Sequence, residues 1–147
     1  MTLYLDDLKR GDRFTSATHR MEAAEIRAFA TQFDPQPFHL DEAAGRGSLF
    51  GELVASGWHT AAIAMRLMVD GGLPIAGGII GTGADIRWRA PVRAGDELHV
   101  VCEILEILPS RSNSNRGAVR IACNTLNQRG EAVTTAEMRV IVSRRPA

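Results

Sequence analysis

The chain has 147 residues and a mass of 16.0 kDa, a size at which one hydrophobic core is the usual outcome, so we expect a single domain over residues 1–147. Hydrophobic residues make up 45% and charged residues 23% of the chain, a balance that excludes the disordered and fibrous classes. Seventeen basic and seventeen acidic side chains cancel to a net charge of zero, which removes the broad attraction behind non-specific binding to nucleic acid and anionic membranes, so neither is an expected partner.

Helical spacing dominates the first half of the chain. A helix is predicted over residues 22–33, where apolar side chains recur at intervals of three and four at Ile26, Phe29, Ala30 and Phe33. Two prolines then disfavour a helical backbone at the residues before them, so residues 34–39 are expected to form a stiff, non-helical loop. A second helix is predicted over about 51–70; it is apolar almost all round, which indicates burial on every side.

Beyond Pro74, alternation of apolar and polar side chains replaces helical spacing and predicts strands. We expect four of them, near 78–90, 96–108, 116–128 and 131–143, and a further strand near 12–20. A tight turn at 127–130 makes neighbouring strands antiparallel. These elements indicate an α+β protein, an antiparallel sheet of about five strands wrapped round a long central helix, because wrapping is what buries an apolar helix. Such a sheet has exposed edges, so a homodimer is the minimal expected assembly.

Signals for targeting, membrane spanning and metal binding are missing from the sequence. Acidic residues interrupt the apolar stretch at 1–10, which argues against a signal peptide and predicts a cytoplasmic protein. The longest apolar run, 53–65, is shorter than the ~20 residues of a membrane span. Cys102 and Cys123 lack the spacing of a zinc site or disulfide framework, so two reduced, partly buried thiols are expected. The four histidines show no metal-ligand spacing, and no metal site is expected.

Asp34 and His39 are a carboxylate and an imidazole on the proline-stiffened loop next to the predicted apolar helix. A rigid loop can hold both side chains on one water molecule, which suits general acid–base catalysis because imidazole titrates near neutrality and a fixed carboxylate orients water or accepts its proton. From the residues alone, the same pair is also compatible with a capping or loop-stabilising role.

Two other motifs carry weaker signals. Ser56 precedes Gly57 but lacks the Gly-x-Ser-x-Gly elbow of serine hydrolases, so a small packing or helix residue is the favoured interpretation. The glycine-rich stretch 77–83 lacks both the Lys-Ser/Thr of a P-loop and the order of a dinucleotide fingerprint. It is interpreted as a loop and strand entry where another backbone or a ligand approaches closely.

Four segments of the chain resemble one known family in sequence and in order. They are Phe29-Ala-Thr-Gln-Phe-Asp-Pro-Gln-Pro-Phe-His39, Phe50-Gly-Glu-Leu-Val-Ala-Ser-Gly-Trp-His-Thr60, Asp85-Ile-Arg-Trp-Arg-Ala-Pro-Val-Arg-Ala-Gly-Asp-Glu-Leu98 and Asn127-Gln-Arg-Gly-Glu131. They are similar to the MaoC-like dehydratases, which include the R-specific enoyl-CoA hydratases. The resemblance implies the hot-dog fold, a long antiparallel sheet curled round a central helix.

The resemblance also implies a reaction. The family hydrates trans-2-enoyl thioesters, or runs the reverse dehydration, with an Asp and a His in an Asp-x-Asn-Pro-apolar-His loop, and Asp34 and His39 match these positions. A water held between them would attack carbon 3 while a proton reaches carbon 2 on the same face, with no metal or organic cofactor. Gly57 matches the backbone N–H donor that stabilises the enolate-like thioester oxygen.

The substrate site implied by the resemblance includes Gln36, Ser56, Trp58 and His59, although a hydrogen bond inside the core is the favoured interpretation of His59. Two positions depart from the family pattern. Gln36 replaces the usual Asn and lengthens the reach of the amide. An apolar Met65 aligns with a polar side chain that supports the catalytic Asp in hydratases.

The implied partner is an acyl-CoA thioester, which is an anion, so local positive charge is expected at the cavity mouth. A basic strand edge supplies candidates that could instead be simply solvated, namely Arg87, Arg89 and Arg93. Two alternative functions stay open at this point: a hot-dog acyl-CoA thioesterase, in which water attacks the carbonyl, and a non-catalytic acyl-CoA-binding subunit. The family places the thioester near a subunit interface, which again implies a homodimer or a higher homo-oligomer.

Overall fold

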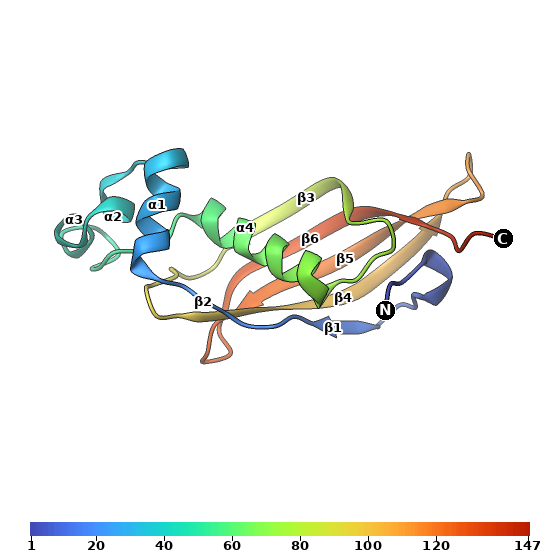
Figure 1. The fold of residues 1–147 in the computed structure, drawn as a ribbon, viewed down its shortest axis with the longest axis horizontal. Coiled ribbons are helices and arrows are strands. Elements are labelled where there is room, and N and C mark those ends of the chain that lie inside the picture. The colour runs from blue at the N-terminus through green and yellow to red at the C-terminus, as the bar shows by residue number, and fades with distance from the viewer.

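A curved antiparallel sheet forms the centre of the molecule in the computed structural model, which describes residues 1–147 (Figure 1). Its strands are β1 (Arg13–Thr15), β2 (His19–Arg20), β3 (Ile80–Trp88), β4 (Glu97–Pro109), β5 (Arg116–Leu126) and β6 (Ala132–Ser143). The spatial order is β1-β4-β5-β6-β3, with β2 also paired to β4. The four strands predicted from residue 78 onward are confirmed, whereas the strand predicted near 12–20 is two short strands.

Alternating burial along β4 and β5 explains why these segments are strands. Val100, Cys102 and Ile104 on β4 are completely buried, and the residues between them are partly exposed. Cys102 faces Cys123 of β5 across the pair, with the two Sγ atoms 3.7 Å apart, and both are buried free thiols. One face of the sheet is therefore the main core, as period-two alternation requires.

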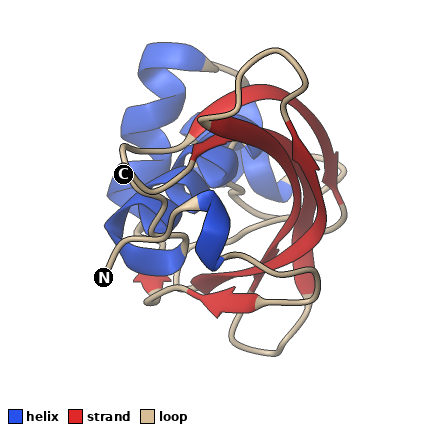
Figure 2. Ribbon diagram, turned by 90° about the vertical axis from the view of Figure 1, so that its right-hand side faces the viewer, coloured by secondary structure: helices blue, strands red, loops and turns tan.

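The helices are η1 (Leu5–Asp7), α1 (Ala23–Phe33), α2 (Pro37–Leu40), α3 (Glu42–Arg46), α4 (Gly57–Leu67) and η2 (Met68–Gly72). Figure 2 shows the helices on the side toward which the sheet curves, so the predicted wrapping is confirmed. Ala64 and Leu67 of α4 are buried against the sheet, but Trp58 and Met65 are 59% and 39% exposed. The expectation of burial all round α4 is therefore wrong for its outer face, because one chain supplies a sheet on one side only.

The predicted helix over 51–70 begins too early. Ser56 is the cap of α4, since its side chain accepts a hydrogen bond from the N–H of Trp58. Directly before it, the N–H of Ala55 donates to the carbonyl of Val92 at 2.8 Å, so this stretch is extended and tied to the chain beyond β3. Apolar composition alone did not distinguish a buried extended segment from a buried helix.

Helix α1 starts within one residue of its prediction, and the N–H of Glu22 donates to the Glu25 side chain at 2.8 Å to close its first turn. The expectation of a wholly non-helical loop over 34–39 is wrong in its second half, because α2 begins at Pro37. Proline lacks the N–H that a first helical turn leaves unused and has a helical φ, so it favours a helix start. None of the helices combines the length and apolar character that crossing a bilayer requires.

Candidate active site

Three helix ends meet at one cavity. Asp34 is the residue that ends α1, His39 lies in α2, and Gly57 is the first residue of α4. All three line a cavity of about 460 Å³. The remaining wall is mostly apolar and aromatic and consists of Gln36, Phe38, Phe50, Val54, Ala55, Trp58, Trp88, Arg89, Ala90, Pro91 and Val92.

The Asp34 and His39 side chains face each other across 3.3 Å, measured from Oδ2 to Nε2. The other ring nitrogen of the buried His39, Nδ1, lies 2.7 Å from the carbonyl oxygen of Val54. A carbonyl oxygen only accepts, so the hydrogen of neutral His39 is assigned to Nδ1. Nε2 is then left with a free lone pair beside a carboxylate, which is the arrangement of a base that takes a proton from water.

Asp34 is held ionised by its neighbours. The amide Nε2 of Gln36 donates to Asp34 Oδ1 at 2.6 Å, which leaves Oδ2 for the cavity and His39. Partial burial raises the pKa of the Asp34 carboxyl, but hydrogen bonding by Ser56 and Gln36 and the charge that His39 carries when protonated outweigh it, so the pKa lies below the usual 3.8. At neutral pH Asp34 is therefore a proton acceptor or an orienting group rather than an acid.

Gly57 presents a free backbone N–H to the same cavity. It is the first residue of α4, and this N–H has no acceptor within the chain. N–H groups in the first turn of a helix have no intrahelical partner, and the helix dipole favours negative charge there. This end of α4 can therefore stabilise an oxyanion.

Of the four residues predicted at the substrate, the structure brings Gln36 and Trp58 into the cavity wall and places Ser56 and His59 outside it. Ser56 is fully buried and acts behind the wall, on Asp34 and on the start of α4.

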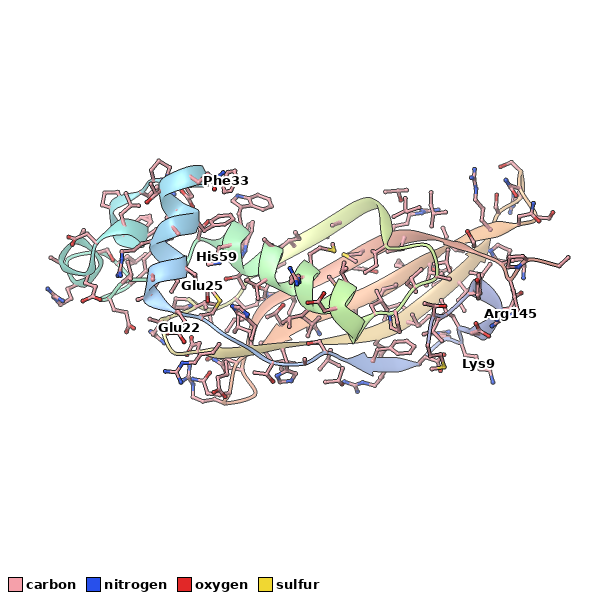
Figure 3. All side chains as sticks on the ribbon, in the orientation of Figure 1. Lys9, Glu22, Glu25, Phe33, His59 and Arg145 are labelled. Atoms are coloured by element: carbon pink, nitrogen blue, oxygen red, sulfur yellow. The ribbon has the colours of Figure 1, made fainter.

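His59 is buried in the core, but it lacks the hydrogen bond that the alternative interpretation expected, because its Nδ1 has no partner. Its side chain extends from α4 toward α1, with Nε2 3.8 Å from Oε2 of Glu25 (Figure 3). Its ring stacks on Phe29 with the centroids 4.7 Å apart. Burial lowers the pKa of His59, the charge of Glu25 opposes that effect, and the charge of His19 adds to it.

The structure also places the two residues that depart from the family pattern. Met65 is exposed and lies away from the cavity. Gln36 lies in the cavity wall, and it and Ser56 lower the pKa of Asp34 by hydrogen bonding.

Only one of the three candidate arginines lines the cavity. Arg89 does so, and its Nε donates to Thr135 Oγ1 at 3.0 Å. The other two are paired elsewhere, Arg87 with Asp85 at 3.1 Å and Arg93 with Glu52 at 2.9 Å. No group of His, Cys, Asp and Glu side chains is arranged to hold a metal ion.

Two features of the site were missed in the sequence. The Val54 carbonyl that orients His39 is a backbone atom, so no residue pattern signals it. Trp88 packs edge to face with Trp58, ring centroids 5.0 Å apart, and covers Gly57. A large aromatic residue at the end of a predicted strand, shortly before Pro91, was the available signal.

A sheet curled round a helix, with Asp34, His39 and a helix N-terminus at one cavity, defines a hot-dog protein. Residues 9–125 match the MaoC like domain, and the chain belongs to the MaoC-like dehydratase family. It is 30% identical over 146 residues to a 3-hydroxybutyryl-CoA dehydratase of Methylorubrum extorquens, covering 97% of this chain and 86% of that protein.

Two solved structures of related proteins are also similar to this chain. The crystal structure of a MaoC-like dehydratase from Rhodospirillum rubrum is 60% identical, with a TM-score of 0.97 and 99% of both chains covered. The R-hydratase PhaJ1 from Pseudomonas aeruginosa is 30% identical, with a TM-score of 0.81 and coverage of 98% of this chain and 88% of that one.

Proposed function

We propose that this protein is a hydro-lyase that adds water to a trans-2-enoyl thioester of coenzyme A, or removes it from the corresponding 3-hydroxyacyl thioester. The observation that carries the proposal is the contact between Asp34 Oδ2 and His39 Nε2, at 3.3 Å in a cavity that also holds the free N–H of Gly57. The names of two similar proteins, a 3-hydroxybutyryl-CoA dehydratase and an R-hydratase, support this reaction class.

The proposed reaction begins with a water molecule between Asp34 and His39. The pair accepts one proton from the water while the water oxygen forms a bond to carbon 3, and the double bond shifts its electrons toward the thioester carbonyl. The pair then returns a proton to carbon 2. The net change is addition of H and OH across the double bond, both from the face on which the pair lies, and the protein ends in its starting protonation state.

Negative charge on the thioester oxygen is the costly feature of this reaction. The N–H of Gly57, at the start of α4, is the donor we assign to that oxygen. Backbone N–H groups are held in place before the reaction starts, so no reorganisation is needed as charge develops. No metal or organic cofactor takes part in the proposed reaction.

Coenzyme A is the proposed carrier, with Arg89 at the cavity as the residue of this chain that meets its phosphates. The proposed assembly is a cytoplasmic homodimer or a higher homo-oligomer. The outer edge of β3 and the outer faces of α4 and η2 support self-association, since Ile80, Trp58 and Val69 are 56%, 59% and 61% exposed.

The test is hydration of crotonyl-CoA and longer trans-2-enoyl-CoAs, followed by loss of the enoyl absorbance and by chiral analysis of the 3-hydroxyacyl product. We expect the (R)-3-hydroxyacyl product, and a rate lowered about 10²-fold to 10⁴-fold by Asp34→Asn or His39→Ala with folding retained. Release of free thiol without an enoyl change would instead identify a thioesterase. Tight binding without any turnover would identify a non-catalytic acyl-CoA-binding subunit.

A further inference from the structure

The side of the cavity next to Gly57 is closed by Trp88, the last residue of β3. A Cβ atom added to Gly57 would lie 2.5 Å from Trp88 Nε1, 2.7 Å from Cε2 and 2.8 Å from Cδ1. These three atoms belong to the five-membered ring of the indole. The nitrogen edge of Trp88 therefore lies directly on the Cα of the residue whose N–H faces the proposed thioester oxygen.

The indole N–H of Trp88 is uncommitted. Indole nitrogen can only donate, and Trp88 Nε1 has no acceptor within the chain. Of the other donors at the cavity, the Gln36 amide donates to Asp34 and the ring of His39 donates to the Val54 carbonyl. The Trp58 indole N–H also has no acceptor within the chain, but the atoms nearest to an added Gly57 Cβ all belong to Trp88. Two free N–H groups, one from backbone and one from an indole, are thus side by side at Gly57.

Trp88 is positioned through its backbone and through the contacts of its ring with Trp58 and Gly57, and 46% of the residue is exposed. Trp88 pairs with Thr134 of β6 in the sheet, and the next residue, Arg89, donates its backbone N–H to the Val133 carbonyl at 2.8 Å. The ring of Trp58 packs against the indole at an interplanar angle of 77°. The Trp88 ring packs directly on Gly57, so any side chain at residue 57 would displace the ring. A donor held in this way needs no rearrangement during a reaction.

We propose that Trp88 Nε1–H is a second hydrogen-bond donor to the thioester oxygen, beside the N–H of Gly57. The inference rests on the proposed function and adds a catalytic residue to it. A carbonyl oxygen accepts two hydrogen bonds, and both strengthen as the oxygen gains charge on the way to the enolate, so the second donor lowers the barrier more than it tightens substrate binding.

The first experiment compares crotonyl-CoA hydration by the wild type, Trp88→Phe and a variant with β-(3-benzothienyl)alanine at residue 88, which keeps the shape of the indole and replaces its N–H by sulfur. We expect kcat to fall about 10²-fold in both, with KM nearly unchanged for the benzothienyl variant. Arg87→Gln is the matched control, on the same strand and paired outside the cavity, and is expected to keep the wild-type kcat. A benzothienyl variant with wild-type kcat would overturn the proposed role of Trp88 and would leave the proposed function in place.

The second experiment needs no turnover. The absorption band of 2,4-hexadienoyl-CoA moves to longer wavelength when a protein polarises its thioester carbonyl, and Asp34→Asn provides a background in which this probe stays intact. We expect a red shift in Asp34→Asn that is clearly smaller when Trp88→Phe is added, at similar affinity. Equal shifts would refute the second donor. A wild type that hydrates no enoyl-CoA would overturn the proposed function, and the role of Trp88 with it.

Discussion

His39 Nδ1 and the carbonyl oxygen of Val54 lie 2.7 Å apart, so the main chain rather than a side chain sets the orientation of the imidazole. A second hydrogen bond joins the chain around Val54 to α2: the N–H of Val54 donates to the carbonyl of Phe38 at 3.1 Å. Substitution of the Val54 side chain cannot remove the acceptor. The tautomer that leaves Nε2 free for chemistry is therefore secured by the fold.

Gln36 offers a test of how Asp34 is kept ionised. The Gln36→Leu variant loses the donor to Asp34 Oδ1, so the pKa of Asp34 is expected to rise, because one of the hydrogen bonds that lower it is gone. The acid limb of the profile of kcat/KM against pH should then move to higher pH. Gln36→Asn, which keeps an amide, is the matched control and should move it less. An acid limb that stays in place in Gln36→Leu would contradict this role.

Gly57→Ala is expected to be severely impaired. Its Cβ would overlap the Trp88 indole at 2.5 to 2.8 Å, so either the ring or the start of α4 must move. We expect a loss of about 10²-fold or more in kcat and a destabilisation of about 1–3 kcal/mol, typical of overpacking. Gly47→Ala is the control, since Gly47 has φ −81° and its nearest atoms lie 3.8 Å from an added Cβ. Steady-state kinetics and thermal melting measure both effects.

Buried His59 should make the protein less stable in mild acid. Burial, the largest effect, places the pKa of His59 below its usual 6.5, so the unfolded chain binds a proton more readily than the folded one. Its contribution to stability is complete above pH 6.5 and is lost as the pH falls through 6.5 toward the folded pKa. The His59→Phe variant keeps a ring against Phe29 but cannot titrate. Urea unfolding at pH 7.5 and 5.5 should show a smaller drop for the variant than for the wild type; equal drops would refute the effect.

Arg89 is expected to contribute to binding and not to chemistry. Arg89→Gln removes the guanidinium from the cavity wall, and we expect KM for crotonyl-CoA to rise about tenfold with kcat nearly unchanged. The N-acetylcysteamine thioester of crotonate, which carries no phosphate, should show a much smaller change. Arg87→Gln, whose guanidinium pairs with Asp85, is the matched control. Equal effects on both thioesters would show that Arg89 does not meet the phosphates.

Strands β4 and β5 were predictable because each of them buries one face, whereas β3 is exposed along nearly its whole length. Along β5 every second residue is buried, so alternation in the sequence reports the fold directly. Extended residue Ala55 was mistaken for helix because its apolar neighbours carry no period, and its backbone partner, the carbonyl of Val92, lies far along the chain. The start of α2 at Pro37 was missed because proline was interpreted only as a helix breaker.

The candidate site was predictable where chemistry depends on side-chain type and spacing, as for Asp34 and His39, and through family resemblance for Gly57. Contacts between distant segments carry no such signal. The structure was needed to find that Ser56 lies behind the cavity wall, that His59 packs in the core, and that Trp88 reaches Gly57.

The stretch Ala90-Pro91-Val92 forms one wall of the cavity and provides no group to the proposed reaction. Asp34, His39 and Gly57 lie on a separate segment of the chain. Substitutions in the wall can therefore enlarge or narrow the proposed acyl site without replacing a residue of the proposed proton transfer. During evolution, point mutations at three neighbouring codons could alter which acyl groups fit while the reaction is inherited unchanged, as is common when one scaffold serves many substrates.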